Sequence, residues 1–187
     1  MRTIALTLAA LAAFTSSLAT AAVAGSPCES EMQAASTKYG VPLGVLYAVG
    51  LTESGRKESL QPYAMNIAGL PYFAPDLESA LARFEEERAK GVKLIDVGCM
   101  QINHHFHGKE FDSVAAMFNP HANVEYAARF LKALRTQEGS WTLAVARYHA
   151  GPNNNPAQKK YVCLVITNMV ATGFGGWTPE AKTFCKG

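Results

Sequence analysis

Glu53 lies at the end of an apolar stretch that starts at Val41 and has the composition of a buried helix. A carboxyl group in such a place is poorly solvated, which disfavours its charged form and raises its pKa. A carboxylic acid that keeps its proton near neutral pH can donate that proton to a leaving group. Glu53 is therefore our candidate general acid; the alternative is a solvated glutamate at a helix end. The hydroxyl of the neighbouring Ser54 is suited to bond this carboxyl or a substrate, or else to cap the helix.

A second group of chemically useful side chains is contained in the segment Gly98-Cys-Met-Gln-Ile-Asn103. The amides of Gln101 and Asn103 carry both hydrogen-bond donors and acceptors, which suits the hydroxyl and acetamido groups of a sugar. Met100 has a flexible apolar side chain that can line a sugar-binding surface. The alternative for this segment is a buried turn whose amides are satisfied within the protein.

A third motif, Ala146-Arg-Tyr-His-Ala-Gly151, ends a predicted helix. The phenol of Tyr148 can form a hydrogen bond at a reaction centre while its ring packs in the wall, although a tyrosine of the hydrophobic core is the alternative. Tyr161 is a weaker candidate of the same kind. One acid, two amides and a phenol in three separate motifs together indicate the cleavage of a glycan.

Hydrophobic periodicity and helix-end signals predict a mainly α single domain that would position these motifs. We expect helices over residues 29–39, 45–52, 76–91, 114–118, a long one from 120, 141–148 and 157–170. Asp112 is expected to cap the short helix 114–118. Residues 55–75, which are rich in glycine, proline and aromatic residues, are expected to form a loop, and 92–97 is the one candidate strand.

The first 24 residues have the pattern of an export signal: a basic start, an uncharged apolar stretch, and small residues at Ala22-Val23-Ala24. The apolar stretch is shorter than the roughly 20 residues that a membrane span requires. Residues 25–187 are therefore expected to form one monomeric domain that is periplasmic or secreted.

Four cysteines, at positions 28, 99, 163 and 185, lack the short spacing of a zinc site, and export favours their oxidation. One or two disulfides are expected, and all three pairings remain open. We favour a bond from Cys28 to one of the C-terminal cysteines, since it would hold both ends of the domain. Cys99, within an apolar motif, is then the candidate for a buried free thiol.

His104, His105 and His107 form a histidine-rich segment without the helical spacing and the carboxylate or cysteine partner of a zinc site. We therefore expect loop histidines, no metal and no cofactor. The formal net charge of +2 favours neither a nucleic-acid partner nor a membrane surface.

The motifs together resemble the soluble-type lytic transglycosylases, which share a lysozyme-like fold with goose-type lysozymes. The family pattern of Glu-Ser, Gly-x-Met-Gln-Ile, Tyr-Asn-Ala-Gly and Tyr-Val has counterparts here at residues 53–54, 98–102, 148–151 and 161–162. Asn119-Pro120 and Asn123-Val124 match as well, so the resemblance covers roughly residues 28–170. Segments 62–66 and 96–99 are similar to a periplasmic branch of Gram-negative bacteria.

The resemblance implies cleavage of peptidoglycan without a metal or cofactor. Glu53 would protonate the oxygen between N-acetylmuramic acid and N-acetylglucosamine, and would then accept the proton of the muramic acid C6 hydroxyl as a 1,6-anhydro ring closes. The acetamido group of the substrate is expected to assist. By the same resemblance, the residues that would bind or line the substrate are Ser54, Met100, Gln101, Asn103, Tyr148 and Arg147, the last through its backbone carbonyl.

The chain departs from the family pattern in three places. His149 stands where asparagine is usual, and Cys99 takes a place commonly held by an apolar residue, which points to a disulfide near the groove. The stretch from Glu53 to Gly98 is longer than in most members. We expect these changes to affect substrate length and specificity more than the chemistry.

Two other functions remain open at this point. A hydrolytic muramidase needs a base that activates water; goose-type enzymes place an aspartate where this chain has Asn103, and Asp96 is the candidate replacement. A non-catalytic module that binds peptidoglycan for a secretion or flagellar apparatus would have no reason to keep Glu53. A third function, a metalloprotease, would be suggested by the histidines alone, and the lack of a zinc-site spacing disfavours it.

Overall fold

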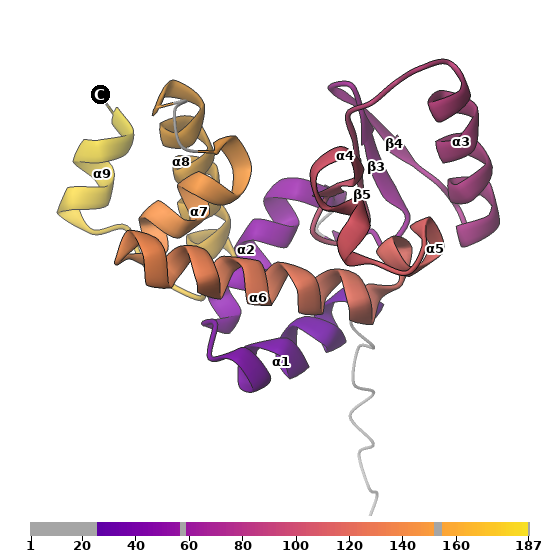
Figure 1. Ribbon diagram of the computed structural model, residues 1–187. Helices are drawn as coiled ribbons and strands as arrows, with labels where there is room; N and C mark the ends of the chain where they lie inside the picture. The colour runs from indigo at the N-terminus through magenta and orange to yellow at the C-terminus, as the bar shows by residue number, and fades with distance from the viewer. Residues whose placement is uncertain (1–25, 57–58, 152–154, 187) are drawn as a thin grey trace, which may run out of the picture.

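The computed structural model describes residues 26–56, 59–151 and 155–186, and the predicted export signal lies outside these ranges. Helices account for most of the described residues, which confirms the expected mainly α, lysozyme-like fold. Most helices gather on one side of the molecule, and a small sheet with the helix α3 (Leu77–Ala89) lies on the other (Figure 1). Within the described ranges, no helix is both long and apolar enough to cross a lipid bilayer.

Glu53 belongs to the helix α2 (Leu43–Ser54), which is apolar on nearly every side and is therefore enclosed. It packs between α1 (Pro27–Tyr39) and α8 (Asn155–Ala171). Gly50 of α2 permits a close approach, because a Cβ there would lie 2.5 Å from the Met32 side chain. As predicted, α1 ends at Gly40, which adopts the left-handed conformation with φ of 67°.

The long helix α6 (Pro120–Glu138) packs against both α1 and α7 (Trp141–Ala150) (Figure 1). The side chain of Asn119 caps its first turn, and Pro120 occupies the first helical position, where it lacks no needed donor. A last helix that the sequence did not predict, α9 (Pro179–Lys186), packs on α8.

The sheet is antiparallel, with the strand order β4-β3-β5-β6. Its strands are β3 (Ala64–Ile67), β4 (Leu70–Phe73), β5 (Ile95–Val97) and β6 (Ile102–Asn103). A shorter pair, β1 (Gly55–Arg56) and β2 (Ser59–Leu60), directly follows α2. The strand expected within 92–97 is confirmed, but the loop expected over 55–75 is wrong.

The β3–β4 hairpin turns at Ala68 and Gly69, whose φ values are 49° and 95°. Two residues with positive φ form the tight turn whose twist matches that of paired strands. The Asn66 side chain accepts a hydrogen bond from the Gly69 backbone at 2.7 Å and supports the turn. The hairpin could not be predicted from the sequence, because alanine rarely adopts a positive φ.

The remaining elements connect the sheet to the helices. The helix expected to begin at Asp76 begins at Leu77, and Asp76 caps it by accepting from the Ser79 backbone at 2.7 Å. After the sheet come α4 (His104–His107), the 3-10 turn η1 (Gly108–Glu110) and α5 (Val114–Phe118). The cap of α5 is Ser113 and not the predicted Asp112, because the Ser113 hydroxyl accepts from the Ala116 backbone at 3.1 Å.

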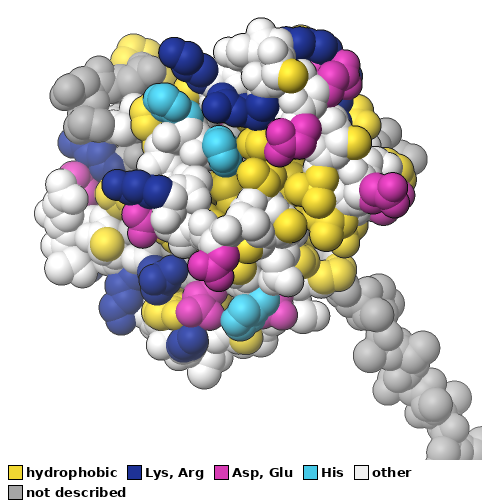
Figure 2. All heavy atoms as spheres, turned by 45° about the vertical axis from the view of Figure 1, so that its right-hand side comes forward, with side chains coloured by type: hydrophobic (Ala, Val, Ile, Leu, Met, Phe, Trp, Pro, Cys, Tyr) yellow, Lys and Arg dark blue, Asp and Glu magenta, His cyan; other side chains and the backbone are white. Residues whose placement is uncertain are grey.

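The hydrophobic core joins the helices to the sheet. Its largest fully buried side chains come from both sides: Phe84, Phe118, Met32, Leu46, Leu60, Met65, Ile95, Met100, Met117 and Leu131. On the face seen in Figure 2, hydrophobic side chains also reach the surface among charges of both signs. That mixture agrees with the low net charge of the chain.

Two disulfides are present, Cys28–Cys99 and Cys163–Cys185. The pairing that we favoured from the sequence and the free thiol at Cys99 are therefore both wrong. Cys28, in the first turn of α1, is bonded to the segment after β5, whereas Cys185 lies on α9, which packs against α8. The two ends of the domain are thus tied separately, and the bond near the Gly98 motif is confirmed.

Replacing Cys28 and Cys99 together by alanine should lower the free energy of unfolding by about 2–4 kcal/mol, because their bond closes a long loop in the unfolded chain. It joins buried residues 71 positions apart. The matched variant is Cys163→Ala/Cys185→Ala. It removes a bond that spans 22 positions and holds the peripheral α9, so its free energy of unfolding should fall by less. Urea unfolding followed by circular dichroism measures both, and equal losses would contradict this ranking.

Candidate active site

Glu53 lies in the last turn of α2 and faces α8, and its side chain is 15% exposed. Tyr161 of α8 donates a hydrogen bond from its hydroxyl to Glu53 Oε1 at 2.6 Å. His149 Nδ1 lies 3.6 Å from the same oxygen. Within the described residues no hydrogen-bond partner is recorded for Oε2, so one carboxyl oxygen is held and the other is available.

The rings of His149 and Tyr161 are stacked beside this carboxyl, with centroids 4.1 Å apart and planes 2° from parallel. Tyr161 is buried, whereas the side chain of His149 is exposed. Burial raises the pKa of Tyr161 well above its usual range, and the charge of Glu53 adds to the rise. The phenol therefore remains a hydrogen-bond donor to Glu53, and the stack fixes its direction.

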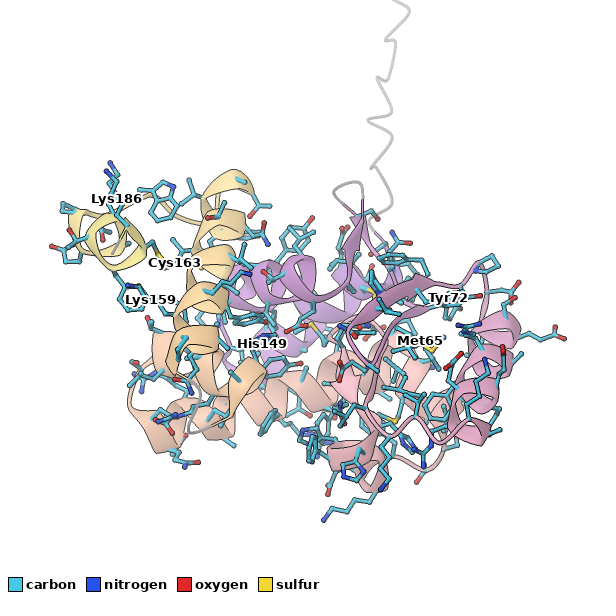
Figure 3. All side chains as sticks on the ribbon, turned by 90° about the horizontal axis from the view of Figure 1, so that it is seen from above. Met65, Tyr72, His149, Lys159, Cys163 and Lys186 are labelled. Atoms are coloured by element: carbon cyan, nitrogen blue, oxygen red, sulfur yellow. A yellow bond between two sulfur atoms is a disulfide. The ribbon has the colours of Figure 1, made fainter. Side chains whose placement is uncertain are left out.

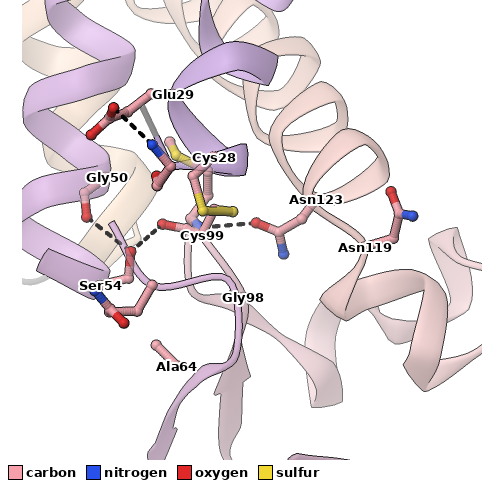
Figure 4. Close-up of a disulfide and its surroundings, with 12 residues drawn as sticks. Cys28, Glu29, Gly50, Ser54, Ala64, Gly98, Cys99, Asn119 and Asn123 are labelled. Carbon is pink, nitrogen blue, oxygen red and sulfur yellow. Dashed lines mark hydrogen bonds between the residues drawn. A yellow bond between two sulfur atoms is a disulfide. The ribbon is translucent and has the colours of Figure 1, made fainter. Parts of the chain in front are cut away.

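Ser54 is buried, and its hydroxyl donates to the backbone carbonyl of Cys99 at 2.6 Å (Figure 4). The carbonyl of Gly50 lies 3.2 Å from the same hydroxyl. The side chain therefore joins the end of α2 to the segment after β5, and it does not reach a surface where a substrate would bind. The structure gives Ser54 a positioning role in place of the expected substrate contact.

The segment after β5 turns at Gly98, whose φ is 82°. A Cβ at this position would lie 2.5 Å from Asn123 Nδ2, so both the conformation and the close approach require glycine. The fully buried Asn123 accepts from the Met100 backbone at 2.8 Å (Figure 4). Its Nδ2 donates to the carbonyls of Val97 and Met117 at 3.0 and 2.8 Å. One buried amide therefore fixes the path of the segment.

Gln101 and Met100 follow this turn and differ in where they point. Gln101 Nε2 donates to the carbonyls of Ala64 and Gly98 at 3.0 and 2.9 Å. Its amide oxygen has no recorded partner in the described ranges and is available as an acceptor. Met100 is fully buried in the core, so the expectation that its side chain lines a binding surface is wrong.

Tyr148 and Arg147 come from the last turn of α7. The Tyr148 hydroxyl donates to the Met100 carbonyl at 2.7 Å, and burial, followed by the charge of Glu53, raises its pKa well above the usual range. Arg147 Nε lies 3.2 Å from Glu138, so that side chain is directed elsewhere. The Arg147 carbonyl accepts from the Gly151 backbone at 3.0 Å at the helix end.

Asn103 and Asp96 form a polar pair on the neighbouring strands β6 and β5. Asn103 Nδ2 donates to Asp96 Oδ1 at 2.6 Å, and Asn103 Oδ1 accepts from the His105 backbone at 3.0 Å. The amide expected to bind substrate thus caps α4 and orients Asp96. Burial raises the pKa of Asp96, and the charge of Glu53 also raises it, although the bond from Asn103 opposes the rise. Asp96 is therefore a second carboxyl within electrostatic reach of Glu53.

The histidine-rich segment is part of the aromatic packing. His104 packs edge-on against Phe84 with centroids 4.9 Å apart, and His107 Nδ1 lies 2.8 Å from the Tyr126 hydroxyl. Burial lowers the pKa of both imidazoles. Among the residues that the structure describes, no group of three or more His, Cys, Asp or Glu side chains is arranged to hold a metal ion.

Sequence reasoning underrated Tyr161 and His149, which make the contacts nearest to Glu53. The sequence makes Tyr161 a weaker candidate than Tyr148, and it marks His149 only as a departure from the family pattern. A signal was present in α8, where Tyr161, Val162 and Val165 are all buried and share the apolar spacing of a helix face. His149 gave no such signal, because its place beside Glu53 depends on how α7 packs against α8.

Asp96→Asn should stabilise the protein at neutral pH. Because burial raises the folded-state pKa of Asp96 above its usual value of 3.8, this carboxyl contributes stability below that value and loses it as the pH rises through the folded-state pKa. The urea midpoint of the variant should therefore exceed that of the wild type at pH 7, and the gap should narrow in acid. Asp112→Asn, at an exposed position, is the control. A less stable Asp96→Asn variant at pH 7 would refute the assignment.

In comparisons with known proteins, no curated protein and no solved structure matches the chain. The family described as the transglycosylase SLT domain matches residues 30–163. The match includes Glu53, the Gly98 segment, Tyr148 and Tyr161, and it ends before α9. The chain therefore belongs to the transglycosylase SLT domain family, whose activity is of the peptidoglycan transglycosylase type.

Proposed function

We propose that this protein is a lytic transglycosylase that cleaves the β-1,4 bond between N-acetylmuramic acid and N-acetylglucosamine in peptidoglycan. Glu53 is the catalytic residue. The observation that carries the proposal is its carboxyl group, which is largely buried, held at Oε1 by the Tyr161 hydroxyl, and without a recorded partner at Oε2 among the described residues. Because Oε1 accepts the phenol hydrogen, the acidic proton would be carried by Oε2.

The reaction would need one carboxyl in two successive roles. Glu53 donates its proton to the glycosidic oxygen, and the bond from that oxygen to C1 of muramic acid breaks. The carboxylate then takes the proton of the C6 hydroxyl, whose oxygen bonds to C1 and closes the 1,6-anhydro ring. Glu53 ends the cycle protonated, and no water is consumed. The acetamido group of the substrate would stabilise the charge at C1 in between.

The contacts with the sugar would come from groups that the structure leaves available around Glu53. We propose the Gln101 amide oxygen as an acceptor for a substrate hydroxyl or N–H, since its Nε2 is already held by two carbonyls. Tyr148 would contribute through the lone pairs of its hydroxyl oxygen, because its hydrogen is committed to Met100. Asn103 and Ser54 would act through Asp96 and Cys99.

Hydrolysis is the second candidate reaction, and Asp96 is the observation that favours it. A hydrolase that inverts its substrate uses a second carboxylate to activate water. The charge of Glu53 acts on Asp96, which places the two carboxyls in one electrostatic environment. The products distinguish the two reactions, because hydrolysis leaves reducing muramic acid ends and the proposed reaction leaves anhydro ends.

We also propose a location outside the cytoplasm, either periplasmic or secreted. The two disulfides support it, because such bonds persist in oxidising compartments, and so does a cell-wall substrate. At that location the protein would act as a monomer, and it could open the cell wall for an envelope-spanning secretion or flagellar machine.

Glu53→Gln should lower the rate of murein cleavage by about 10³-fold or more, because an amide can neither donate nor accept the required proton. Turbidity of a murein suspension gives the rate, and mass spectrometry of the wild-type products should find anhydromuramic ends. Glu85→Gln, on the exposed face of α3, is the control and should cleave normally. If Glu53→Gln still clears the suspension, the assigned acid is wrong; if the ends are reducing, the enzyme is a hydrolase.

Two tyrosine substitutions should distinguish a hydroxyl that orients Glu53 from one that stabilises the fold. They are Tyr161→Phe and Tyr148→Phe. Tyr161→Phe removes the bond that orients Glu53, so cleavage should slow by about tenfold, with little change in unfolding. Tyr148→Phe leaves the Met100 carbonyl without its partner and should lower the free energy of unfolding by about 1–3 kcal/mol. Initial cleavage rates and urea unfolding test both; an unchanged rate for Tyr161→Phe would contradict the role given to its hydroxyl.

A further inference from the structure

A groove of about 820 Å³ lies between α8 and α9, at the end of the molecule away from the sheet. The Cys163–Cys185 disulfide joins its two walls. Its lining residues are Pro156, Lys159, Lys160, Cys163, Leu164, Thr167, Trp177, Lys182, Cys185 and Lys186. Most of the groove lies beyond the residues that match the family, which end at position 163.

The groove is positively charged. Four lysines line it, two from α8 and two from α9, and no carboxylate is among its described lining residues. Glu180, in the first turn of α9, is not one of them. Within the described part of the chain none of the four lysines forms an ion pair. Four ammonium groups that have no carboxylate partner among the described residues favour an anionic ligand.

Apolar side chains accompany these charges. Leu164 and Trp177 line the groove and are 48% and 36% exposed, which is high for large apolar residues. The Lys159 ammonium lies 5.3 Å from the centre of the Phe184 ring, a cation–π contact that favours its position beside α9. A ligand that carries both anionic and apolar groups fits this combination better than a simple ion.

We propose that this groove binds the peptide stems of peptidoglycan through their carboxylates. The inference rests on the proposed function, since it takes the same polymer as its ligand. Each muramic acid of the polymer bears a lactyl group from which a short peptide with free carboxylates extends. Those carboxylates match the lysines, and the alkyl side chains of the stem match Leu164 and Trp177.

The groove and Glu53 share one helix. Tyr161 of α8 holds Glu53, while Lys159 and Cys163 of the same helix face α9. Figure 3 shows Lys159, Cys163 and Lys186 together at one end of the molecule, with His149 between them and the sheet. A polymer with many stems can therefore occupy the groove while another part of it approaches Glu53. Two linked contacts of this kind raise the effective concentration of the substrate at the carboxyl.

The test measures binding in a Glu53→Gln background, so that no glycan is cleaved and the result does not depend on the catalytic proposal. The probe is solubilised peptidoglycan chains that keep their stems, compared with the same chains after an amidase has removed the stems. Lys182→Gln/Lys186→Gln should weaken binding to the stem-bearing chains by about fivefold at low salt. It should affect the stripped chains much less, because the amidase leaves them only the one carboxylate of each lactyl group, and about 0.5 M salt should remove the difference. The charge-matched control is Lys93→Gln/Lys109→Gln, exposed positions on the other side of the molecule.

A second variant tests whether binding needs the arrangement of α8 and α9 as well as the charge of the lysines. Cys163→Ser/Cys185→Ser keeps all four lysines but releases α9 from α8, and it should also weaken binding to stem-bearing chains. The inference is overturned if the lysine variant binds as its control does, if it loses affinity for stripped chains equally, or if the groove lysines govern binding to anionic lipid vesicles instead. If the wild type fails to cleave murein while the lysine variant still binds stem-bearing chains less tightly, the proposed function fails and this inference stands.

Discussion

The candidate active site depends on a buried connection between the end of α2 and the turn after β5. The Ser54 hydroxyl donates to the Cys99 carbonyl at 2.6 Å, and the disulfide from Cys28 holds the same residue from the other side. Asn123 fixes the next peptide through the Met100 backbone. Because these groups are excluded from water, any loosening would leave polar atoms unpaired, which is costly. Glu53 is therefore held in a fixed position relative to the Gly98 turn.

Neighbours from several elements around that connection determine the environment of the Glu53 carboxyl. Tyr161 of α8 and His149 of α7 approach Glu53 Oε1, and the charge of Glu53 raises the pKa of Asp96 in the sheet. Burial disfavours the charged form of Asp96, and the charge of Glu53 disfavours it further. Such an arrangement reduces stability, and it is found where a protein needs proton transfer. His149 adds an exposed imidazole to the environment of Glu53.

Local signals predicted the helices well and the sheet poorly. Asp76, Gly40 and Pro120 act at helix ends as expected, because capping depends on residues next to each other in the chain. The β3–β4 hairpin was missed since its turn uses Ala68 with positive φ, which no common turn sequence indicates. The disulfide pairing was wrong for a related reason: which cysteines meet depends on packing between distant elements, and spacing alone carries no such information.

The sequence by itself determined the family, the mainly α fold and the identity of Glu53 as the candidate acid, because residue type and helical periodicity are local properties. The tertiary structure decided what surrounds that acid. It assigned the Ser54 hydroxyl and the Asn103 amide to internal bonds, and it brought Tyr161, 108 positions away, to the carboxyl. The physical reason is that hydrogen bonds and burial act through space. The sequence shows which side chains have suitable chemistry, but the packing of the helices and the sheet decides which of them come into contact.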